Sequence, residues 1–281
     1  RKGWYDECAD LDHVAAPGET DYAASSARFV AALRRLRGEP SALPRLPHEH
    51  SFFLSLTYPD LAAALPLPSA LWVNTDAVEL RADLLADQSA DNLRRQIALL
   101  KAHCPLPVIF TIRSKEEAGA FTGTDEEYFA MNTTALRAGC EWIDCEAGKD
   151  GRTLQGFAAE ARKLGAKLLG SNHVLGPMPS LKDIGKAFER CKLRGAASVA
   201  KFVGFATEPA HALHVHAAAS AAGLTSRTPH IALAMSAAGR MSRVLNVHWT
   251  PVTHPLLPAA AAPGQMSVAQ ILDARRTLGY L

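Results

Sequence analysis

The sequence predicts an α/β fold, specifically a (β/α)8 TIM barrel with a short N-terminal helical extension. From residue 51 onward, short strand-like runs alternate with helical patterns, and eight such runs can be distinguished. The chain has 281 residues, 48% of them hydrophobic, which is enough for such a barrel to form as one domain. A doubly wound open sheet is the alternative, but no G-x-G-x-x-G sequence follows the first expected strand.

The expected strands and helices follow one another in regular order. One expected helix spans residues 125–139, begins with Asp125 and two glutamates, and ends at Gly139, which are the residue types preferred at the two ends of a helix. Another covers residues 91–103. Because parallel neighbours need a crossover connection, this alternation favours parallel pairing of the strands. The eight expected strands cover residues 51–56, 76–82, 106–112, 141–146, 167–172, 197–203, 230–235 and 246–252.

The first part of the chain does not fit this alternation, so we divide the chain into an N-terminal extension and linker (1–47) and a barrel (48–281). A helix is expected over residues 19–38, where the apolar residues on one face are Phe29, Val30, Leu33 and Leu36. Glycine and proline residues then interrupt the pattern. The first residues contain no apolar segment of a signal peptide and no initiator Met, which suggests a fragment of a longer chain.

Composition and charge argue against several classes of function. The formal net charge is only +2 and no long run of Lys or Arg occurs, so we expect no nucleic-acid partner. No apolar run reaches the roughly 18 residues that a membrane-spanning helix needs, so no membrane partner is expected. The five cysteines are odd in number and lack a C-x-x-C pair, which indicates reduced thiols in a cytoplasmic protein.

Ionisable residues fall at the carboxyl ends of the expected strands, where the active sites of such barrels lie. Lys201 lies within the apolar run ASVAKFVGFA, and a buried lysine either pairs with an acid or loses its proton and becomes a nucleophilic amine. His173 ends the run LLGSNH, and a general base beside such an amine suits Schiff-base chemistry on a ketone. The other polar residues near these strand ends are Glu79, Arg81, Arg113, Glu117, Asp144, Glu146, Arg243 and Gln265.

A purely structural role is the competing interpretation of these residues. Lys201 could reach solvent from a strand end, His173 could simply pack, and Glu79 and Arg81 could form a salt-bridged strand end. The convergence of ionisable groups from several strands on one mouth favours a functional site instead.

The two arginines after the third and seventh strands suggest what such a site would bind. Arg113 and Arg243 suit carboxylates or hydroxyl groups, because the guanidinium group offers a planar fork of donors. Their charge would also favour an unprotonated Lys201 by repulsion.

The ordered motifs on successive strands resemble the type I 3-dehydroquinate dehydratase family. They are VELRADLL, TIRS, IDCE, SNH, VAKFV and, above all, SRVLN, TPVTHPLLP and AAPGQMS, and they extend from about residue 51 to the C-terminus. The last two are closest to the dehydratase domain of the fungal-type pentafunctional arom polypeptides. The resemblance implies a hydro-lyase that eliminates water from 3-dehydroquinate to give 3-dehydroshikimate in the shikimate pathway, without a metal or other cofactor.

The same resemblance implies a role for each candidate residue. The catalytic residues would be Lys201, which forms an imine with the substrate ketone, His173 as general base and acid, and Glu117, which orients the histidine. The residues that hold the substrate hydroxyl groups and order the site would be Glu79, Arg81 and Arg113. Those that bind the substrate carboxylate would be Arg243 and Gln265.

Two positions depart from the family pattern, and the extension carries a resemblance of its own. Val174 stands where an aspartate usually follows the histidine, and Ala118-Gly119 where two glycines are usual. Both departures put the rate in doubt more than the reaction type. Residues 1–47 resemble the tail of a shikimate kinase domain, which implies a multienzyme chain with shikimate kinase before the barrel and shikimate dehydrogenase after it.

Other functions remain open at this point. Another class I lyase, such as an aldolase, would use the same imine, and a barrel kept as a weakly active structural module would use none. The histidines of the H-x-x-H-x-H sequence (211–216) suggest zinc, but only the first two share a helix face. Without a third convergent ligand we expect no metal site.

Overall fold

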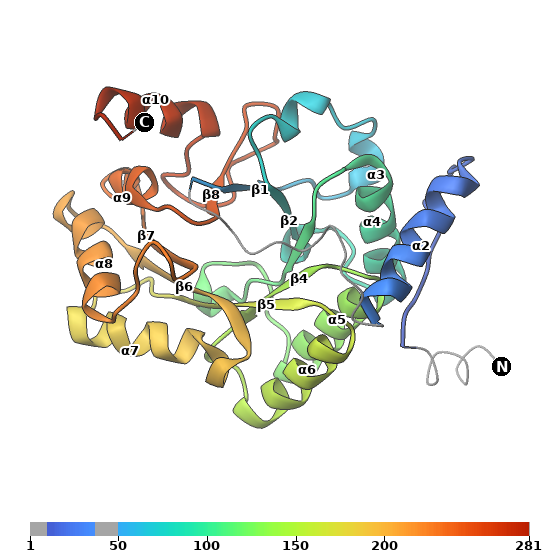
Figure 1. Ribbon diagram of the computed structural model, residues 1–281, viewed down its shortest axis with the longest axis horizontal. Coiled ribbons are helices and arrows are strands. Elements are labelled where there is room, and N and C mark those ends of the chain that lie inside the picture. The colour runs from blue at the N-terminus through green and yellow to red at the C-terminus, as the bar shows by residue number, and fades with distance from the viewer. Residues whose placement is uncertain (1–9, 37–49, 281) are drawn as a thin grey trace.

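The computed structural model describes residues 10–36 and 50–280, and its centre is a barrel of eight parallel strands surrounded by helices (Figure 1). Successive strands are neighbours, and β1 also pairs with β8. Among the described residues no ladder joins β7 to β8, so the barrel is nearly closed at this seam. The strands are β1 (Phe52–Leu56), β2 (Ala77–Arg81), β3 (Val108–Thr111), β4 (Trp142–Glu146), β5 (Lys167–His173), β6 (Ala197–Phe205), β7 (His230–Met235) and β8 (Thr250–Val252).

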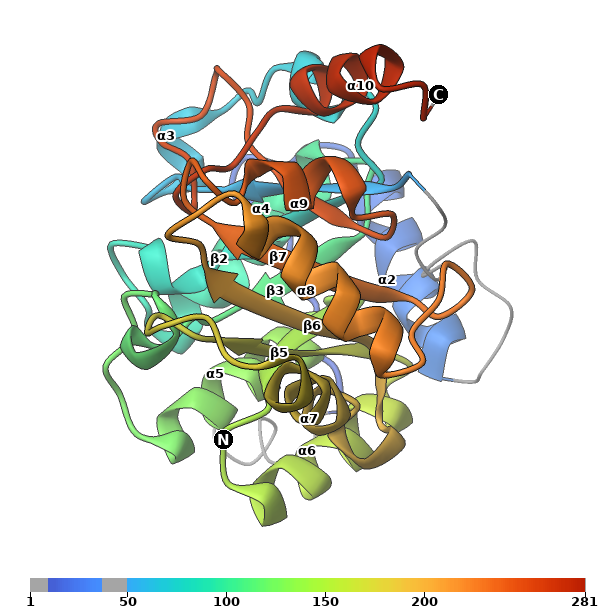
Figure 2. The same cartoon turned by 90° about the vertical axis from the view of Figure 1, so that its left-hand side faces the viewer.

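The connecting helices form an outer shell, in which α7, α8 and α9 cover the outside of β5 to β7 (Figure 2). The barrel helices are α3 (Leu61–Ala64), α4 (Ala90–His103), α5 (Asp125–Arg137), α6 (Gly151–Lys163), α7 (Leu181–Cys191), α8 (Ala210–Ala221), α9 (Arg240–Leu245) and α10 (Val268–Thr277). The short 3₁₀ segments are η1 (Ser69–Trp72), η2 (Ala82–Leu84), η3 (Lys115–Glu117) and η4 (Leu193–Gly195). Helix α5 begins with a capping box in which the side chains of Thr124 and Glu127 each accept the other residue's backbone N–H.

The barrel interior is polar at the carboxyl ends of the strands, which form its mouth, and apolar below them. Trp142 of β4 packs edge to face against Trp249, with ring centroids 4.5 Å apart, in a buried cluster that includes Val199 of β6. Alternate residues of a strand point to the same side. Asp144 comes two residues after Trp142, and Lys201 comes two residues after Val199. The alternation that fills the core therefore also carries polar side chains to the mouth.

The expected barrel is confirmed, and seven of its strands lie within two residues of the expected positions. The expectation for the eighth strand is wrong in its first half, because β8 begins at Thr250 rather than at residue 246. The side-chain amide of Asn246 donates to the carbonyl of His248 (2.8 Å) and to the hydroxyl of Thr250 (2.9 Å). These bonds and the left-handed backbone of Trp249, with φ of +42°, hold a turn where the apolar residues had suggested a strand.

The expected N-terminal helix is present as α2 (Tyr22–Leu36), but its apolar face is not buried. Phe29, Val30 and Leu33 are 38%, 43% and 39% exposed, and the side chain of Leu36 lies outside the described part of the chain. The expected linker and the boundary between residues 47 and 48 also lie outside the described residues.

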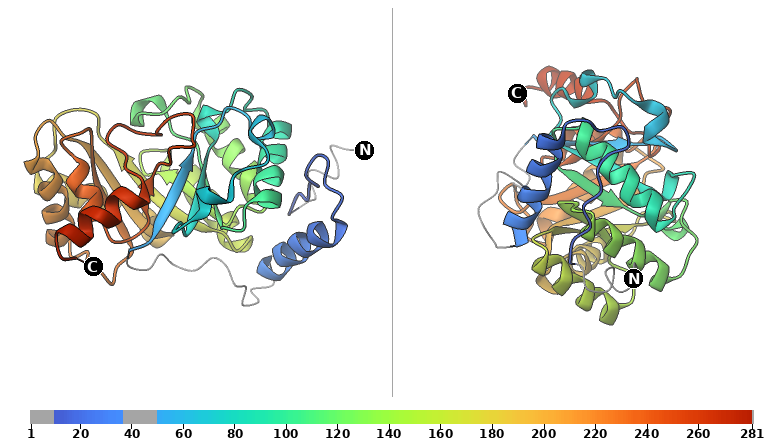
Figure 3. Two further views of the ribbon diagram at one scale, coloured as in Figure 1. Left: turned by 90° about the horizontal axis from the view of Figure 1, so that it is seen from above. Right: turned by 90° about the vertical axis from the view of Figure 1, so that its right-hand side faces the viewer.

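Helix α2 lies on the outside of the barrel next to α4 (Figure 3). The segment before it is held by polar contacts: the backbone N–H of Asp12 donates to the carbonyl of Arg137 (2.7 Å), and its carboxylate pairs with Arg94 (2.9 Å). Amphipathic periodicity predicted the helix correctly. Which face of the helix is buried depends on its tertiary contacts with the barrel, and a local sequence pattern does not specify these.

Two further expectations concern the whole chain. Within residues 10–36 and 50–280, no helix is both long enough and apolar enough to cross a membrane. The four cysteines in that part of the chain, Cys104, Cys140, Cys145 and Cys191, are free and buried, while Cys8 lies outside it.

Candidate active site

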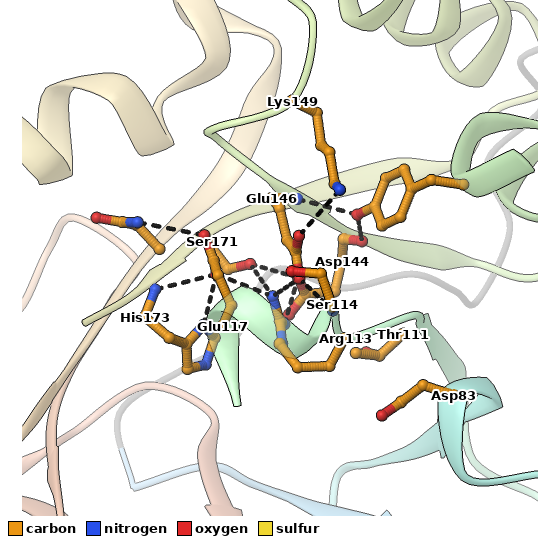
Figure 4. A network of polar contacts seen from close by, with 12 residues as sticks. Asp83, Thr111, Arg113, Ser114, Glu117, Asp144, Glu146, Lys149, Ser171 and His173 are labelled. Carbon is orange, nitrogen blue, oxygen red and sulfur yellow. Dashed lines mark hydrogen bonds and ion pairs between the residues drawn. The ribbon is translucent and has the colours of Figure 1, made fainter. Parts of the chain in front are cut away.

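A buried arginine, Arg113, organises one side of the barrel mouth (Figure 4). Its Nη2 atom lies 2.7 Å from Asp144 Oδ1, and its Nη1 atom lies 3.0 Å from Glu146 Oε1 and 3.3 Å from Glu117 Oε2. Nη1 also donates to the hydroxyl of Ser171 (2.9 Å). Burial by itself would lower the pKa of Arg113, but the three carboxylates outweigh burial and raise it well above its usual value. The arginine is therefore a permanent cation at the centre of this network.

The amine of Lys201 lies directly against a carboxylate. Its Nζ atom donates to Asp144 Oδ2 at 3.1 Å, and the two side chains are only 6% and 1% exposed. Burial would raise the pKa of Asp144, but Arg113 and Lys201 lower it to about 2, so this carboxylate is ionised. Of the two possibilities for a buried lysine, the structure has the paired one. The repulsion expected from Arg113 and Arg243 is thus accompanied by an attractive carboxylate, which the sequence analysis did not place beside Lys201.

His173, at the end of β5, is held by Glu117. The ring Nδ1 atom lies 2.9 Å from Glu117 Oε2, and the backbone N–H of His173 donates to the same oxygen (3.0 Å). A carboxylate beside Nδ1 favours the tautomer with the proton on Nδ1, which leaves Nε2 as a proton acceptor. Burial lowers the pKa of His173 well below its usual value, and the charges of Arg113, Lys201 and Arg81 lower it further. The ring is therefore neutral at neutral pH. Burial raises the pKa of Glu117 to about 7.

Glu79 and Arg81 of β2 face the same cavity but do not form the expected alternative, a salt bridge with each other. Arg81 instead forms a bidentate pair with Asp83, with Nε and Nη2 donating at 2.8 and 2.7 Å. Its Nη1 donates to the carbonyl of Ala261 (3.3 Å), in the loop after β8. Glu79 accepts from the hydroxyl of Thr111 (2.8 Å). Both side chains are buried and fixed at the mouth.

Arg243 of α9 differs from Arg81 and Arg113 because it has no acidic partner in the described part of the chain. It is 2% exposed, its Nη1 donates to the carbonyl of Pro251 (3.1 Å), and its Nε has no hydrogen-bond partner. Burial lowers its pKa to about 10, so it is still charged at neutral pH. Gln265 lies close by, with its amide nitrogen directed to Ser55 Oγ (3.3 Å) and to the carbonyl of Val252 (3.2 Å).

All eight residues to which the family resemblance assigns a role line one cavity at the carboxyl ends of the strands. They are Glu79, Arg81, Arg113, Glu117, His173, Lys201, Arg243 and Gln265. A larger cavity of about 360 Å³ lies between the extension and the α4–α5 side of the barrel. The charged groups there are already paired, as in Asp12–Arg94 and Lys101–Glu141, and none of the selected residues line it. The charged cavity at the mouth is therefore the candidate active site.

Sequence reasoning left several members of this site without a role. Asp144 was recognised as a polar residue at a strand end, but its contact with Lys201 was not predicted. Ser171 links Arg113 to Asp144 by accepting from the first and donating to the second. The period-2 alternation of strands could have found both, because Asp144 follows the inward-facing Trp142 by two residues and Ser171 precedes His173 by two.

The two departures from the family pattern lie beside the site. Ala118 has a left-handed backbone, with φ of +69°, and a Cβ atom at Gly119 would lie 1.9 Å from the carbonyl oxygen of Arg113. Glycine is thus required at position 119, and alanine at position 118 is strained. Val174 is partly buried against an apolar cluster, and its backbone N–H donates to the carbonyl of Val203 (2.8 Å).

The histidines that suggested zinc make other contacts. Nε2 of His214 lies 2.8 Å from the carbonyl of Pro179, and Nε2 of His216 lies 2.9 Å from the carbonyl of Ser242. In the described ranges, 10–36 and 50–280, no group of three or more His, Cys, Asp or Glu side chains is arranged to hold a metal ion.

Fold and site together define a class of protein: a (β/α)8-barrel enzyme with a buried lysine, a neutral histidine and an unpaired arginine at its mouth. Residues 52–281 match the family described as "Type I 3-dehydroquinase". The chain therefore belongs to the type I 3-dehydroquinase family, and its barrel is a dehydratase domain of the lyase class.

Curated relatives place this domain type within much longer chains. The chain is 36% identical over 259 residues to a pentafunctional AROM polypeptide of Malassezia globosa, covering 89% of this chain and 16% of the relative. It is also 36% identical over 298 residues to that of Schizosaccharomyces japonicus, covering 100% of this chain and 18% of the relative. The chain thus spans less than a fifth of the length of either relative.

Solved structures agree with this fold. A chain containing dehydroquinate dehydratase and shikimate dehydrogenase from S. pombe AroM is 32% identical and superimposes with a TM-score of 0.75, covering 89% of this chain and 47% of that one. A type I 3-dehydroquinate dehydratase from Clostridium difficile is 19% identical, with a TM-score of 0.70, and the match covers 84% of this chain and 96% of that one. The second likeness supports the fold alone.

Proposed function

We propose that this barrel converts 3-dehydroquinate into 3-dehydroshikimate through a Schiff base on Lys201. One observation carries the proposal: the amine of Lys201 lines the same cavity as His173 and as Arg243, a buried arginine for which residues 10–36 and 50–280 supply no acidic partner. A nucleophile, a base and a site for an anion are what a keto acid substrate requires. Membership of the type I 3-dehydroquinase family names that keto acid.

In the first step, the Lys201 Nζ attacks the ketone carbon, and loss of one water gives a protonated imine. The amine must be unprotonated when it attacks, so a proton of Lys201 Nζ is released to solvent beforehand. Because the pKa of Asp144 is about 2, its carboxylate stays ionised throughout. It lies 3.1 Å from Nζ and would stabilise the iminium cation as it stabilises the ammonium group.

In the second step, His173 Nε2 removes a proton from the carbon next to the imine, and the electron pair moves into the iminium. The low pKa of the buried ring keeps it neutral and able to accept this proton. The same proton is then given to the departing hydroxyl, which leaves as water. Glu117 would keep the proton on Nδ1 and so direct Nε2 to the substrate. Hydrolysis of the product imine returns the lysine.

The remaining residues would bind and order the substrate. Arg243, with Gln265 beside it, is proposed to bind the carboxylate, which supplies the anionic partner that the arginine lacks within the described chain. Glu79 and Arg81 would contact hydroxyl groups from β2. Arg113 is already engaged by three carboxylates, so we assign it to positioning those carboxylates rather than to direct binding.

We further propose that the barrel works in a multienzyme chain. Residues 1–47 would be the end of a preceding shikimate kinase domain and its linker, with the dehydratase domain beginning at residue 48 and a shikimate dehydrogenase domain after it. Support comes from the pentafunctional relatives, one of which is matched over the whole of this chain. The free, buried cysteines of the described part of the chain suit a cytoplasmic location.

The test is to mix the protein with 3-dehydroquinate and borohydride, then measure intact mass and map the modified peptide. We expect a substrate-sized adduct on Lys201 and its loss in Lys201→Ala, while Lys163→Ala, which removes an exposed lysine, keeps it. An adduct on another lysine would overturn the assigned nucleophile. Absence of any adduct and of turnover in folded wild-type protein would overturn the proposed function. That result would favour a structural barrel, or an aldolase if another carbonyl substrate is trapped.

A further inference from the structure

We propose that Asn172 is a positioning residue: its side-chain amide holds the carboxylate of Glu117 in the orientation that keeps His173 a proton acceptor. This inference rests on the proposed function and extends it to a residue outside the eight assigned above. It is carried by a chain of hydrogen bonds that runs from the surface of α7 to the catalytic histidine.

The two oxygens of Glu117 have separate partners. Oε2 accepts from the backbone N–H of His173 (3.0 Å), contacts its Nδ1 (2.9 Å) and pairs with Arg113 (3.3 Å). Oε1 accepts from the side-chain amide of Asn172 at 3.2 Å, and no other donor to this oxygen is found among the described residues. Asn172 therefore sets the rotation of the carboxylate about its own axis.

The orientation of the Asn172 amide is itself determined by Arg190 of α7. The Arg190 guanidinium can only donate, and its Nη2 lies 3.5 Å from Asn172 Oδ1. With the amide oxygen directed to Arg190, the amide N–H groups face Glu117. The reversed amide would set an oxygen against the carboxylate and an N–H group against the guanidinium, so both contacts would be repulsive.

Glu117 needs such a partner because of where it lies. It is the last residue of the three-residue 3₁₀ segment η3, and the next residue, Ala118, has a left-handed backbone, so Glu117 lies outside the longer helices and strands of the barrel. Burial raises the pKa of Glu117 to about 7, whereas the charge of Arg113 and the Asn172 hydrogen bond lower it. A protonated Glu117 would donate to His173 Nδ1 and force the ring proton onto Nε2. The histidine could then no longer accept a proton from the substrate.

Several other charged or titratable groups act on Glu117 from neighbouring elements. They are Arg113 after β3, Asp144 and Glu146 on β4, His173 on β5 and Cys191 on α7. All of them are unchanged by substitution of Asn172. A difference between the wild type and an Asn172 variant therefore reports the contribution of this residue.

The decisive experiment measures kcat and KM for 3-dehydroquinate from pH 5 to 9 in the wild type, Asn172→Ala and Arg190→Ala, with Lys186→Ala as a control on the exposed side of α7. Wild-type kcat should rise with pH as Glu117 ionises. Loss of a hydrogen bond to a charged group should lower kcat of Asn172→Ala at pH 7 about tenfold and move this rise to higher pH, with KM within about twofold. Arg190→Ala should shift the profile in the same direction by less, and Lys186→Ala not at all.

Two further readouts separate the possible failures. Borohydride trapping on Lys201 should persist in Asn172→Ala, because the proposed imine formation does not use His173. ¹⁵N NMR of the His173 ring should show more proton on Nε2 in this variant.

An active wild type with an unchanged pH profile and ring tautomer in Asn172→Ala would overturn the inference and leave the proposed function intact. A wild type without turnover or adduct would overturn the proposed function itself. If Asn172→Ala does not fold, Arg190→Ala serves in its place, because the Arg190 side chain is exposed. A pH profile of kcat that is unshifted in Arg190→Ala then also counts against the inference.

Discussion

The two sides of the barrel mouth differ in how completely their charges are satisfied. On the side formed by β3 to β6, the guanidinium of Arg113 contacts three carboxylates, and the amine of Lys201 contacts one of these, Asp144. On the side formed by α9 and β8, Arg243 is equally buried, has no acidic partner among the described residues and leaves its Nε unbonded. Nη2 of Arg113 also lacks a hydrogen bond, but it forms an ion pair with Asp144, so the charges of the first side are paired without a ligand, whereas the second side lacks an anion.

This difference separates two tasks of one site. In the proposed function, a network whose charges are already paired holds Lys201 and His173 in fixed positions before substrate arrives, which is how preorganised sites stabilise charge in a transition state. A buried charge without a partner costs stability in the free protein and recovers that energy when an anion binds. Under the proposed function, the same residue type, arginine, serves organisation on one side and recognition on the other.

The largest expected effect comes from removing Arg113, the cation at the centre of the side formed by β3 to β6. Arg113→Ala would leave Glu117, Asp144 and Glu146 buried without their common partner. Breaking a buried ion-pair network in this way costs about 3–5 kcal/mol. We expect a corresponding fall in the free energy of unfolding, measured by urea denaturation, and loss of turnover. Lys186→Ala, which removes an exposed ion pair, should cost less than about 1 kcal/mol. Equal stability losses in the two variants would contradict the comparison.

Removing the base should affect the reaction without affecting substrate attachment. His173→Ala should lower kcat by about 10²–10⁴, the usual contribution of a positioned acid–base group, while the imine on Lys201 still forms. Steady-state kinetics and borohydride trapping measure the two effects separately. His214→Ala, a substitution on α8 away from the cavity, should leave kcat unchanged. Normal turnover in His173→Ala would show that another group is the base.

Removing Arg243 should affect substrate binding rather than stability, whereas removing Arg113 should lower the stability of the protein. Arg243→Met should raise KM at least about tenfold, because the substrate carboxylate loses a buried cationic partner. The free energy of unfolding should stay the same or increase, because an uncompensated buried charge is removed. Arg240→Ala, on the exposed face of the same helix, provides the matched control for both measurements. A marked loss of stability in Arg243→Met without a change in KM would mean that the two sides do not differ in the way described.

The smallest expected effect concerns the backbone of Ala118, next to Glu117 on the side formed by β3 to β6. Ala118 adopts a left-handed conformation that costs an L-residue about 1–2 kcal/mol relative to glycine. Ala118→Gly should therefore stabilise the protein by about 1 kcal/mol, partly offset by the greater freedom of glycine in the unfolded chain. The midpoint of thermal unfolding measures this, and a lower midpoint would contradict the assigned strain.

The sequence predicted the residues of the site more fully than it predicted their contacts. The polar residues at strand ends included all eight that line the cavity, because the mouth of a parallel barrel collects those ends, and the family resemblance gave these eight their roles. The same reasoning assigned Arg113 to substrate and expected arginines to govern Lys201. Both expectations missed Asp144, whose side chain reaches Lys201 across β5, a relation that depends on barrel register and not on sequence spacing.

The same limit applies to the ends of the fold. Amphipathic periodicity predicted helix α2, yet Phe29 and Val30 remain exposed, since the extension is held to the barrel by Asp12 instead. The apolar residues before Thr250 suggested a longer eighth strand, but the Asn246 side chain closes a turn there. The local sequence pattern determines which helix or strand can form. The tertiary contacts of that element determine where it ends and which of its faces is buried.

The sequence by itself thus determined the barrel, the order of its elements and the chemistry available at its mouth, because strand alternation and strand-end polarity are local properties of the chain. Only the tertiary structure decided which charges of the site neutralise one another and which one has no acidic partner among the described residues. That decision depends on distances of a few ångströms between residues 30 to 60 positions apart, as in Arg113 with Asp144 and Lys201 with Asp144. Electrostatic interactions in a buried site are strong enough for such distances to separate an arginine paired with three carboxylates from one that has no acidic partner in the described part of the chain.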